Sequence, residues 1–344
     1  MVAERHPALA DCTRRSIAVM EAFRSFFTAQ GYREEQRSAL VSAYDSSIRF
    51  TNSAISTFKP TLFDGVSRGD RFLLQPALRL QTLKLWLEQG AVSRYGGYFI
   101  ALGTLSTLRS LEDAHRDAVG FFCRTLGLTG ERLLFRASSA DDDFVSAVQS
   151  AGGALRADGT RLDAFRHHYG LPGVLGRNSN IGISDGTGFA DVGNVISIER
   201  DDGTRLGIEI CCSVNSVLAQ LHGISRPILA SPSSAAYVAG QPSLMLADSL
   251  GSSVALVREG LRPRARGRAG NLKSMLRVVI ERQQACALDD ESLLALVSRI
   301  AAEDGAVYEH ASPPSAACAV PLEPAAITAK IADYLDQTRV AVLP

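Results

Sequence analysis

The chain has 344 residues, of which 46% are hydrophobic and 21% charged, and its 36 basic side chains equal its 36 acidic ones in number. This length is typical of two domains, and the apolar content suffices for a sizeable core, so the composition excludes a disordered protein. Charges occupy the N-terminal residues where a signal peptide needs an apolar run. We therefore expect a globular cytoplasmic protein without membrane spans.

The first half of the chain alternates helical and strand patterns. Ile17, Met20, Phe23 and Phe27 recur at helical spacing and predict a helix over 14–30, with Gly31 as its left-handed stop. β-rich runs predict strands at 48–55, 98–102, 133–135 and 195–198, and a helix is predicted from the capping pair Ser110 and Asp113 to Gly127.

Three more helices are predicted near the C-terminus, over 272–279, 291–302 and 325–335, with a Pro-rich loop at 312–314. Helices and strands mix without a strict βαβ alternation. This pattern favours an α+β fold with a mainly antiparallel sheet flanked by helices, followed by a smaller helical domain. We place the domain boundary between 1–240 and 241–344.

The charges are unevenly distributed along the second half. Residues 255–282 carry eight basic and two acidic side chains, whereas 283–344 carry nine acidic and three basic ones. A basic segment beside an acidic tail suits a polyanion partner, and a solvated helix face folded against its acidic neighbour would give the same pattern.

Other possible sites are weakly indicated. The six cysteines form no CxxC pair and have no histidine at zinc spacing, so we expect reduced thiols and no metal site. The segment from Gly182 to Gly186 matches a G-x-S-x-G elbow around Ser184, but a Gly-rich run and a strand follow it, which favours a loop. His167 and His168 are interpreted as a helix end before Gly170, with a metal or base role as the alternative.

A more specific signal is a series of short segments in a fixed order. Ile48-Arg49-Phe50-Thr51-Asn52-Ser53-Ala54 is followed by Phe58-Lys59, Gln75-Pro76-Ala77-Leu78-Arg79, Arg94-Tyr95-Gly96-Gly97-Tyr98-Phe99 and, later, Asn194-Val195-Ile196 and Arg266-Gly267-Arg268. This series resembles the catalytic part of alanyl-tRNA synthetase, a class II aminoacyl-tRNA synthetase, over roughly residues 16–282. The resemblance implies a class II sheet and a helical tRNA-recognition part.

The resemblance also implies roles for individual residues. Arg79 matches the arginine that contacts the α-phosphate of ATP, and Arg94 matches a second phosphate-facing arginine. Tyr98, with Phe99 beside it, matches the aromatic position against adenine, where a flat ring gives stacking area. Asn194 and Glu209 fall in the alanine pocket, with Glu209 at the position that binds the α-ammonium. The tRNA-binding residues implied are Arg262, Arg264, Arg266, Arg268, Lys273 and Arg277.

The departures from the family are also informative. Gapless continuation puts Ser216 where the third class II motif has the arginine that reaches the γ-phosphate. A site with the α-phosphate arginine but without this group suits an aminoacyl-AMP-like species. We therefore predict transfer of an alanyl group from alanyl-tRNA to an AMP-like nucleoside, sulfamoyl or phosphoryl, in natural-product biosynthesis, with no DNA or membrane partner. The alternatives are a minimal synthetase that uses ATP and magnesium, and a non-catalytic tRNA- or partner-binding paralogue.

Overall fold

The computed structural model describes residues 9–41, 48–64, 69–79, 96–159, 162–184, 186 and 188–340. Its helices are α1 (Leu9–Ala29), α2 (Ile55–Asp64), α4 (Leu111–Val119), α5 (Asp142–Ser150), α6 (Val214–His222), α7 (Gly240–Arg258), α8 (Gly267–Ala285), α9 (Asp290–Glu309) and α10 (Pro324–Val340). Its strands are β1 (Arg33–Glu34), β2 (Arg71–Leu78), β3 (Tyr98–Ser106), β4 (Leu133–Ser138), β5 (Ala154–Asp158), β6 (Arg166–His168), β7 (Val174–Ser184), β8 (Phe189–Arg200) and β9 (Arg205–Ser213).

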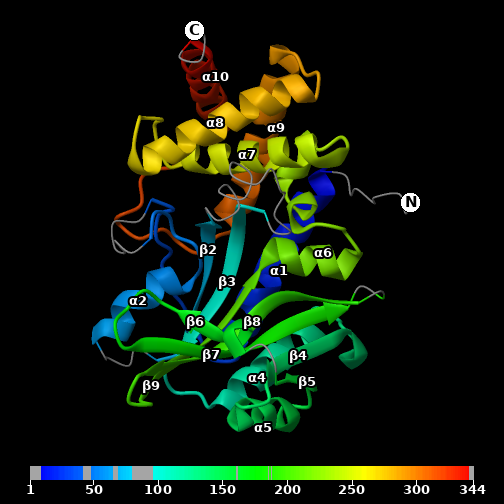
Figure 1. The fold of residues 1–344 in the computed structure, drawn as a ribbon, viewed down its shortest axis with the longest axis vertical. Helices are drawn as coiled ribbons and strands as arrows, with labels where there is room; N and C mark the ends of the chain where they lie inside the picture. The colour runs from blue at the N-terminus through cyan, green and yellow to red at the C-terminus, as the bar shows by residue number, and fades with distance from the viewer. Residues whose placement is uncertain are drawn as a thin grey trace.

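The strands form one sheet in the order β1-β2-β3-β9-β8-β7-β4-β5, and β6 pairs with β7 outside this path. The pairs β1/β2 and β4/β5 are parallel, and the other pairs are antiparallel. The predicted α+β fold with a mainly antiparallel sheet is therefore confirmed. Figure 1 shows the sheet in the lower part of the molecule, with helices α7 to α10 above it.

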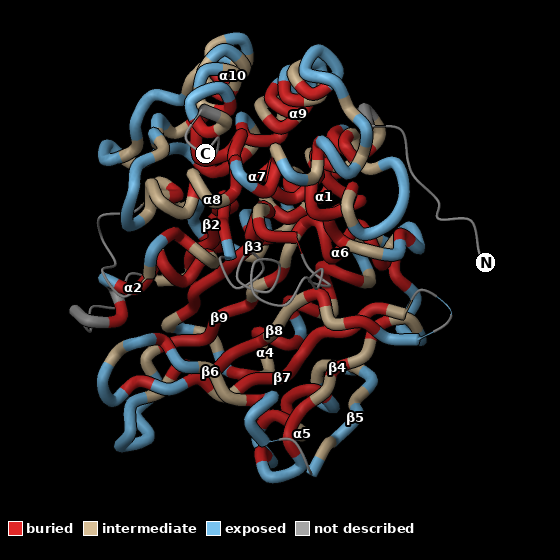
Figure 2. The backbone as a smooth tube through the Cα atoms, turned by 45° about the horizontal axis from the view of Figure 1, so that its top comes forward, coloured by how far each residue is buried: buried red, intermediate tan, exposed pale blue. Residues whose placement is uncertain are grey.

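The two faces of the sheet belong to different apolar clusters, because successive side chains of a strand point to opposite faces. Helix α2 covers one face with Phe58, which packs with Phe99 and Ala101 of β3. The opposite face packs on α1, α4 and α6 through a larger cluster that includes Phe23, Ile100 and Leu102. We call the face under α2 the site face. Most of the central strands are buried (Figure 2).

The larger apolar cluster continues into the C-terminal helices. It contains Leu218 of α6 and Leu250, Leu276, Val297 and Ile331 of helices α7 to α10. The division at residue 240 stays a prediction, and side chains on both sides of it share this cluster. Within the described residues no helix is long and apolar enough to cross a membrane.

The predicted helices were found largely where the periodicity places them. The capping box of Ser110 and Asp113 is formed at the start of α4, and Gly31 and Gly127 both have positive φ angles. After α4 the chain continues as a π-helical turn over Gly120–Thr125.

Three local predictions are wrong. Residues 48–54 are not a strand, because their hydrogen bonds go to different segments: the amide of Thr51 donates to Leu40, and its carbonyl accepts from Leu78. His167 and His168 end no helix; they lie in strand β6, paired with Gly176 and Leu175 of β7. The Ser184 segment was interpreted as a loop, but Gly182, Ile183 and Ser184 are the last residues of β7, and Asp185 lies outside the described residues.

Candidate functional site

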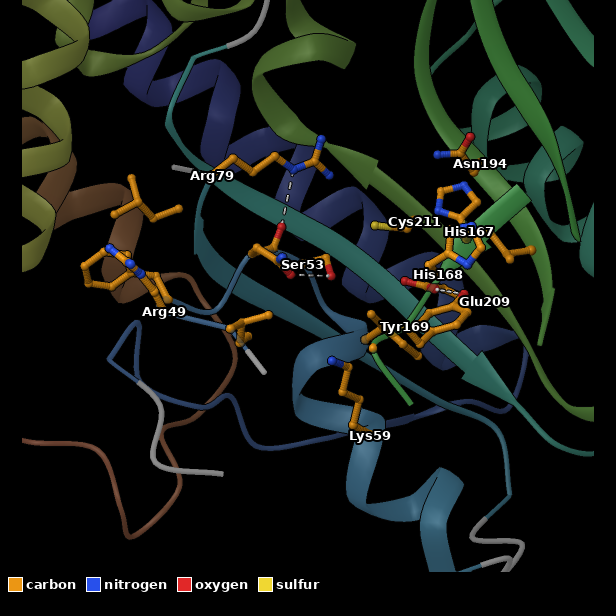
Figure 3. A pocket seen from close by; sticks show the side chains of 17 residues that line it. Arg49, Ser53, Lys59, Arg79, His167, His168, Tyr169, Asn194, Glu209 and Cys211 are labelled. Atoms are coloured by element: carbon orange, nitrogen blue, oxygen red, sulfur yellow. Dashed lines mark hydrogen bonds between the residues drawn. The ribbon is translucent and has the colours of Figure 1, made fainter. Parts of the chain in front are cut away.

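A cavity of about 590 Å³ opens on the site face. Its walls come from the segment before α2, from α2 itself, from the end of β2, and from β6, β8 and β9 (Figure 3). The residues that line it are Ile48, Arg49, Phe50, Asn52, Ser53, Ile55, Lys59, Leu78, Arg79, His167, His168, Tyr169, Gly170, Asn194, Ile196, Glu209 and Cys211. Three of the predicted site residues, Arg79, Asn194 and Glu209, are among them.

The register of β8 and β9 explains why residues distant in sequence meet here. Asn194 pairs with Cys211, and Ile196 pairs with Glu209. Paired residues of neighbouring strands point to the same face. The four side chains therefore form one continuous wall of the cavity.

Arg79 follows the last residue of β2. Its backbone amide donates to the carbonyl of Gly97 at 2.8 Å, and its Nε donates to the carbonyl of Asn52 at 3.4 Å. The guanidinium carbon lies 5.0 Å from the centre of the Phe99 ring, a cation–π contact. Arg79 is exposed at the cavity, so its charge is available to an anion.

The structure contradicts the prediction for Tyr98. Tyr98 and Phe99 are consecutive in β3, so they point to opposite faces of the sheet. Phe99 belongs to the cluster of the site face, whereas Tyr98 packs against the opposite cluster, and its buried hydroxyl oxygen has no hydrogen-bond partner among the described residues. Tyr98 therefore cannot stack on a ligand in this cavity. Arg94 lies outside the described residues.

Glu209 is a carboxyl group inside the protein, with 2% of its surface exposed. Tyr169 Oη donates to its Oε2 at 3.3 Å, and no ion pair joins it to a cation within the described part of the chain. Burial raises its pKa to about 7, against smaller opposing effects of Tyr169, Cys211 and Arg79. A buried carboxylate without a cation favours binding of an ammonium group.

An amide network lies beside Glu209 on the same face. Asn178 is fully buried, and its Nδ2 donates to Asn180 Oδ1 at 2.6 Å and to Asn194 Oδ1 at 3.5 Å. Because Asn194 Oδ1 serves as an acceptor in this network, its amide nitrogen remains as a donor toward the cavity.

A metal or base role for His167 was only the alternative interpretation of the sequence, and the contributions of Tyr169 and Cys211 to the cavity wall were not predicted. For His167 and Tyr169 the signal is Gly176, because a Cβ there would lie only 3.0 Å from His167 Cβ, 3.0 Å from the Tyr169 ring and 2.9 Å from Ile196. This glycine lets β6 pair with β7 while His167 and Tyr169 lie close to the β7 backbone. A single sequence does not identify which glycine has this role.

Ser216, the position of the missing arginine, is buried in the first turn of α6, where its amide donates to Ser213 Oγ at 3.4 Å. It does not line the cavity. All six cysteines are free, and no group of three or more potential metal ligands occurs among the described residues.

The basic segment between α7 and α8 lies next to the cavity mouth. Arg268 Nη2 donates to the carbonyl of Ile48 at 3.3 Å, and Arg49 Nη1 donates to Asn271 Oδ1 at 3.4 Å. Arg262, Arg264, Arg266 and Arg277 are exposed, and Arg268 and Lys273 are half-buried. Within the described ranges none of these six forms an ion pair. We call these six residues the basic strip.

No protein-family model matches the chain. Among solved structures the chain is similar to the asparaginyl-tRNA synthetase of Entamoeba histolytica in complex with asparaginyl-adenylate, at 12% identity and a TM-score of 0.41, over 65% of this chain and 66% of that one. It is also similar to the asparaginyl-tRNA synthetase of Pyrococcus horikoshii. The structure of that enzyme complexed with asparaginyl-adenylate matches at 12% identity and a TM-score of 0.39, over 65% of this chain and 68% of that one. A second structure of that enzyme matches at 13% identity and a TM-score of 0.39, over 66% of this chain and 67% of that one.

Proposed function

We propose that the cavity binds an aminoacyl-adenylate-like ligand, with its phosphate or sulfamate on Arg79 and its α-ammonium on Glu209. The observation that carries this proposal is the presence of both groups on the walls of one cavity, an exposed arginine and a buried carboxyl without an ionic partner among the described residues. A cavity of about 590 Å³ suits a nucleotide-sized ligand. The Phe99 ring is buried beneath the cavity wall and supports the Arg79 guanidinium through the cation–π contact.

In this proposal the protein is an aminoacyltransferase related to class II synthetases. It moves an aminoacyl group from tRNA, alanyl-tRNA on the resemblance described above, to an AMP-like nucleoside of a biosynthetic pathway. The ester of aminoacyl-tRNA is a high-energy donor, so an amide-like bond to a sulfamate nitrogen forms downhill without ATP. The basic strip beside the cavity mouth would hold the tRNA phosphates.

Two ligands test the two ends of the site separately. Calorimetry should show that adenosine 5′-sulfamate binds the parent protein, and that alanyl-sulfamoyl-adenosine binds it more tightly because its ammonium reaches Glu209. The Arg79→Ala variant should weaken both ligands by about 30- to 1,000-fold, in line with loss of about 2–4 kcal/mol. The Glu209→Gln variant should keep the nucleoside affinity and lose the gain from the alanyl group.

The Arg124→Ala variant is the matched control, because Arg124 is exposed on the π-helical turn and does not line the cavity. Equal affinity of both ligands for the parent protein and for Arg79→Ala would contradict the proposed site. A ligand-bound structure with Arg79 and Glu209 more than about 6 Å from any ligand atom, beyond reach through one water, would contradict it as well.

The proposal also predicts little alanine-dependent pyrophosphate exchange, because Ser216 replaces the arginine that reaches the γ-phosphate in the family. Exchange at the rate of a conventional synthetase would instead support ATP-driven activation.

A further inference from the structure

His167 occupies a defined position inside the cavity. It pairs with Gly176 of β7, and the missing side chain at Gly176 leaves room for β6 to bring the imidazole over the site face. Figure 3 shows His167 in the same cavity as Arg79, Asn194 and Glu209.

The ionisable groups around His167 differ in their ability to accept a proton. Arg49, Lys59 and Arg79 are cationic side chains of the same cavity, and His168 is the neighbour on β6. Burial, and then Glu209, raises the pKa values of Tyr169 and Cys211 well above their ordinary ranges, so these two groups keep their protons at neutral pH. Glu209 would be paired with the ammonium of the ligand.

The surroundings of His167 favour its neutral form. Burial lowers its pKa below 6.5, and the charges of Arg79 and His168 lower it further. A neutral imidazole at pH 7 has one free nitrogen lone pair and is a general base.

We propose that His167 is the catalytic base of the transfer reaction, which accepts the proton of the attacking acceptor group and returns it to the ribose oxygen of the tRNA. This inference rests on the proposed function. The nitrogen or oxygen of the AMP-like acceptor attacks the ester carbonyl of the aminoacyl-tRNA. The new bond to the carbonyl carbon forms, the carbon–oxygen bond to the terminal ribose breaks, and the proton passes through His167 to the leaving oxygen. No oxidant or reductant is required.

The direct test is single-turnover transfer from a pool of charged tRNA to adenosine 5′-sulfamate, followed by mass spectrometry between pH 5 and 8. The His167→Gln variant should be slower by about 10²- to 10⁴-fold. It should also lose the fall in rate at low pH that protonation of His167 causes in the parent protein, which begins only below pH 6.5 because burial lowers the pKa of His167. Glu209, with a pKa of about 7 in the ligand-free protein, should affect the pH dependence of both proteins equally.

Two further variants distinguish a chemical role of His167 from a structural one. His167→Ala should regain part of its rate when imidazole is added, which a purely structural role would not allow. The His222→Gln variant should react like the parent protein, because His222 lies on α6 outside the cavity. Transfer by His167→Gln within threefold of the parent rate, or a loss in His168→Gln instead of His167→Gln, would overturn the inference.

Binding of AMP gives a readout that does not depend on transfer. A phosphate on Arg79 would favour protonation of the nearby imidazole, so AMP binding should take up protons in the parent protein and fewer in His167→Gln, as calorimetry in two buffers of different ionisation enthalpy measures. The same proton uptake in both proteins would contradict the inference. If the parent protein binds neither AMP nor adenosine 5′-sulfamate, the proposed function fails and the inference fails with it. If it binds and transfers while His167→Gln matches it, the inference alone fails.

Discussion

The carboxyl group of Glu209 couples the candidate site to the stability of the protein. Its pKa is raised to about 7 by burial, whereas an ordinary glutamate has a pKa of 4.5. Between these two pH values the unfolded chain is ionised while the folded protein keeps its proton. The folded state therefore becomes less stable as the pH rises from about 4.5 to 7, and the loss is complete above pH 7.

The Glu209→Gln variant should remove this loss. We expect it to unfold like the parent protein near pH 4.5 and to be more stable by about 1–3 kcal/mol at pH 8, as measured by urea unfolding at both values. The control is Glu131→Gln, because Glu131 is exposed and outside the cavity. A variant that is less stable than the parent protein at pH 8 would show that Glu209 is paired with a cation in solution.

A second buried carboxyl should act in the same direction. Burial raises the pKa of Asp248 on α7 to about 7, although the amide of Gly97 donates to its Oδ1 at 2.7 Å. Asp248→Asn keeps an acceptor oxygen for Gly97. It should therefore increase stability at pH 8 and have little effect near pH 4, and the same unfolding experiments measure both effects.

At the level of single residues, the sequence could identify Arg79, Asn194 and Glu209 as belonging together, and the cavity contains all three. Whether they bind a ligand stays a prediction. Tyr98 was predicted wrongly because a motif gives the position of an aromatic residue but not the phase of the strand, and one residue decides which face it occupies. His167 depends on the antiparallel pairing of β6 with β7, which the interpretation of this segment as a helix end did not include.

At the level of elements, β3 and α2 contact through Gly103. A Cβ on Gly103 would overlap the Cβ of Ala54, which is fully buried just before α2. Gly103→Ala should therefore cost about 1–3 kcal/mol of stability in urea unfolding. It should also weaken AMP binding, because displacement of Ala54 moves Asn52 and Ser53 of the cavity wall.

The matched control for this substitution is Gly130→Ala. Nothing lies within 4 Å of a Cβ at Gly130, so this variant should be close to the parent protein in stability and in AMP affinity. Equal effects of the two substitutions would contradict the close packing of α2 on β3.

Helices whose apolar residues recur at a regular helical spacing were predicted well, whereas the segment 48–55 was not. The helices α1, α8, α9 and α10 have apolar stripes at helical spacing, which a sequence shows directly. The β-branched and aromatic residues of 48–55 resemble a strand, but the pairing of their backbone with Leu40 and Leu78 depends on tertiary structure.

For the whole molecule, the uneven charge distribution has a direct test. Replacing Arg262, Arg264 and Arg266 together with glutamine should lower tRNA affinity and flatten its dependence on salt, because fewer counterions are released from the phosphates. Binding assays from 50 to 200 mM salt measure both effects.

The control is the replacement of Arg124, Arg156 and Arg205 together with glutamine. These three arginines are also exposed, and they lie on elements other than those of the basic strip. The same decrease in both triple variants would indicate a general charge effect. No tRNA binding by the parent protein at low salt would indicate that the basic strip is only a solvated surface.

The strand order gives the cavity a kinetic property. Arg79 directly follows β2 and Glu209 lies in β9, and these two strands flank β3 in the sheet although they are far apart in the chain. Such non-local pairing is slow to form, and we expect both ends of the site to come together late in folding. A ligand that bridges them has nothing to bind in the early stages. We predict that it leaves the refolding rate unchanged and slows unfolding, as expected for contacts that form after the transition state.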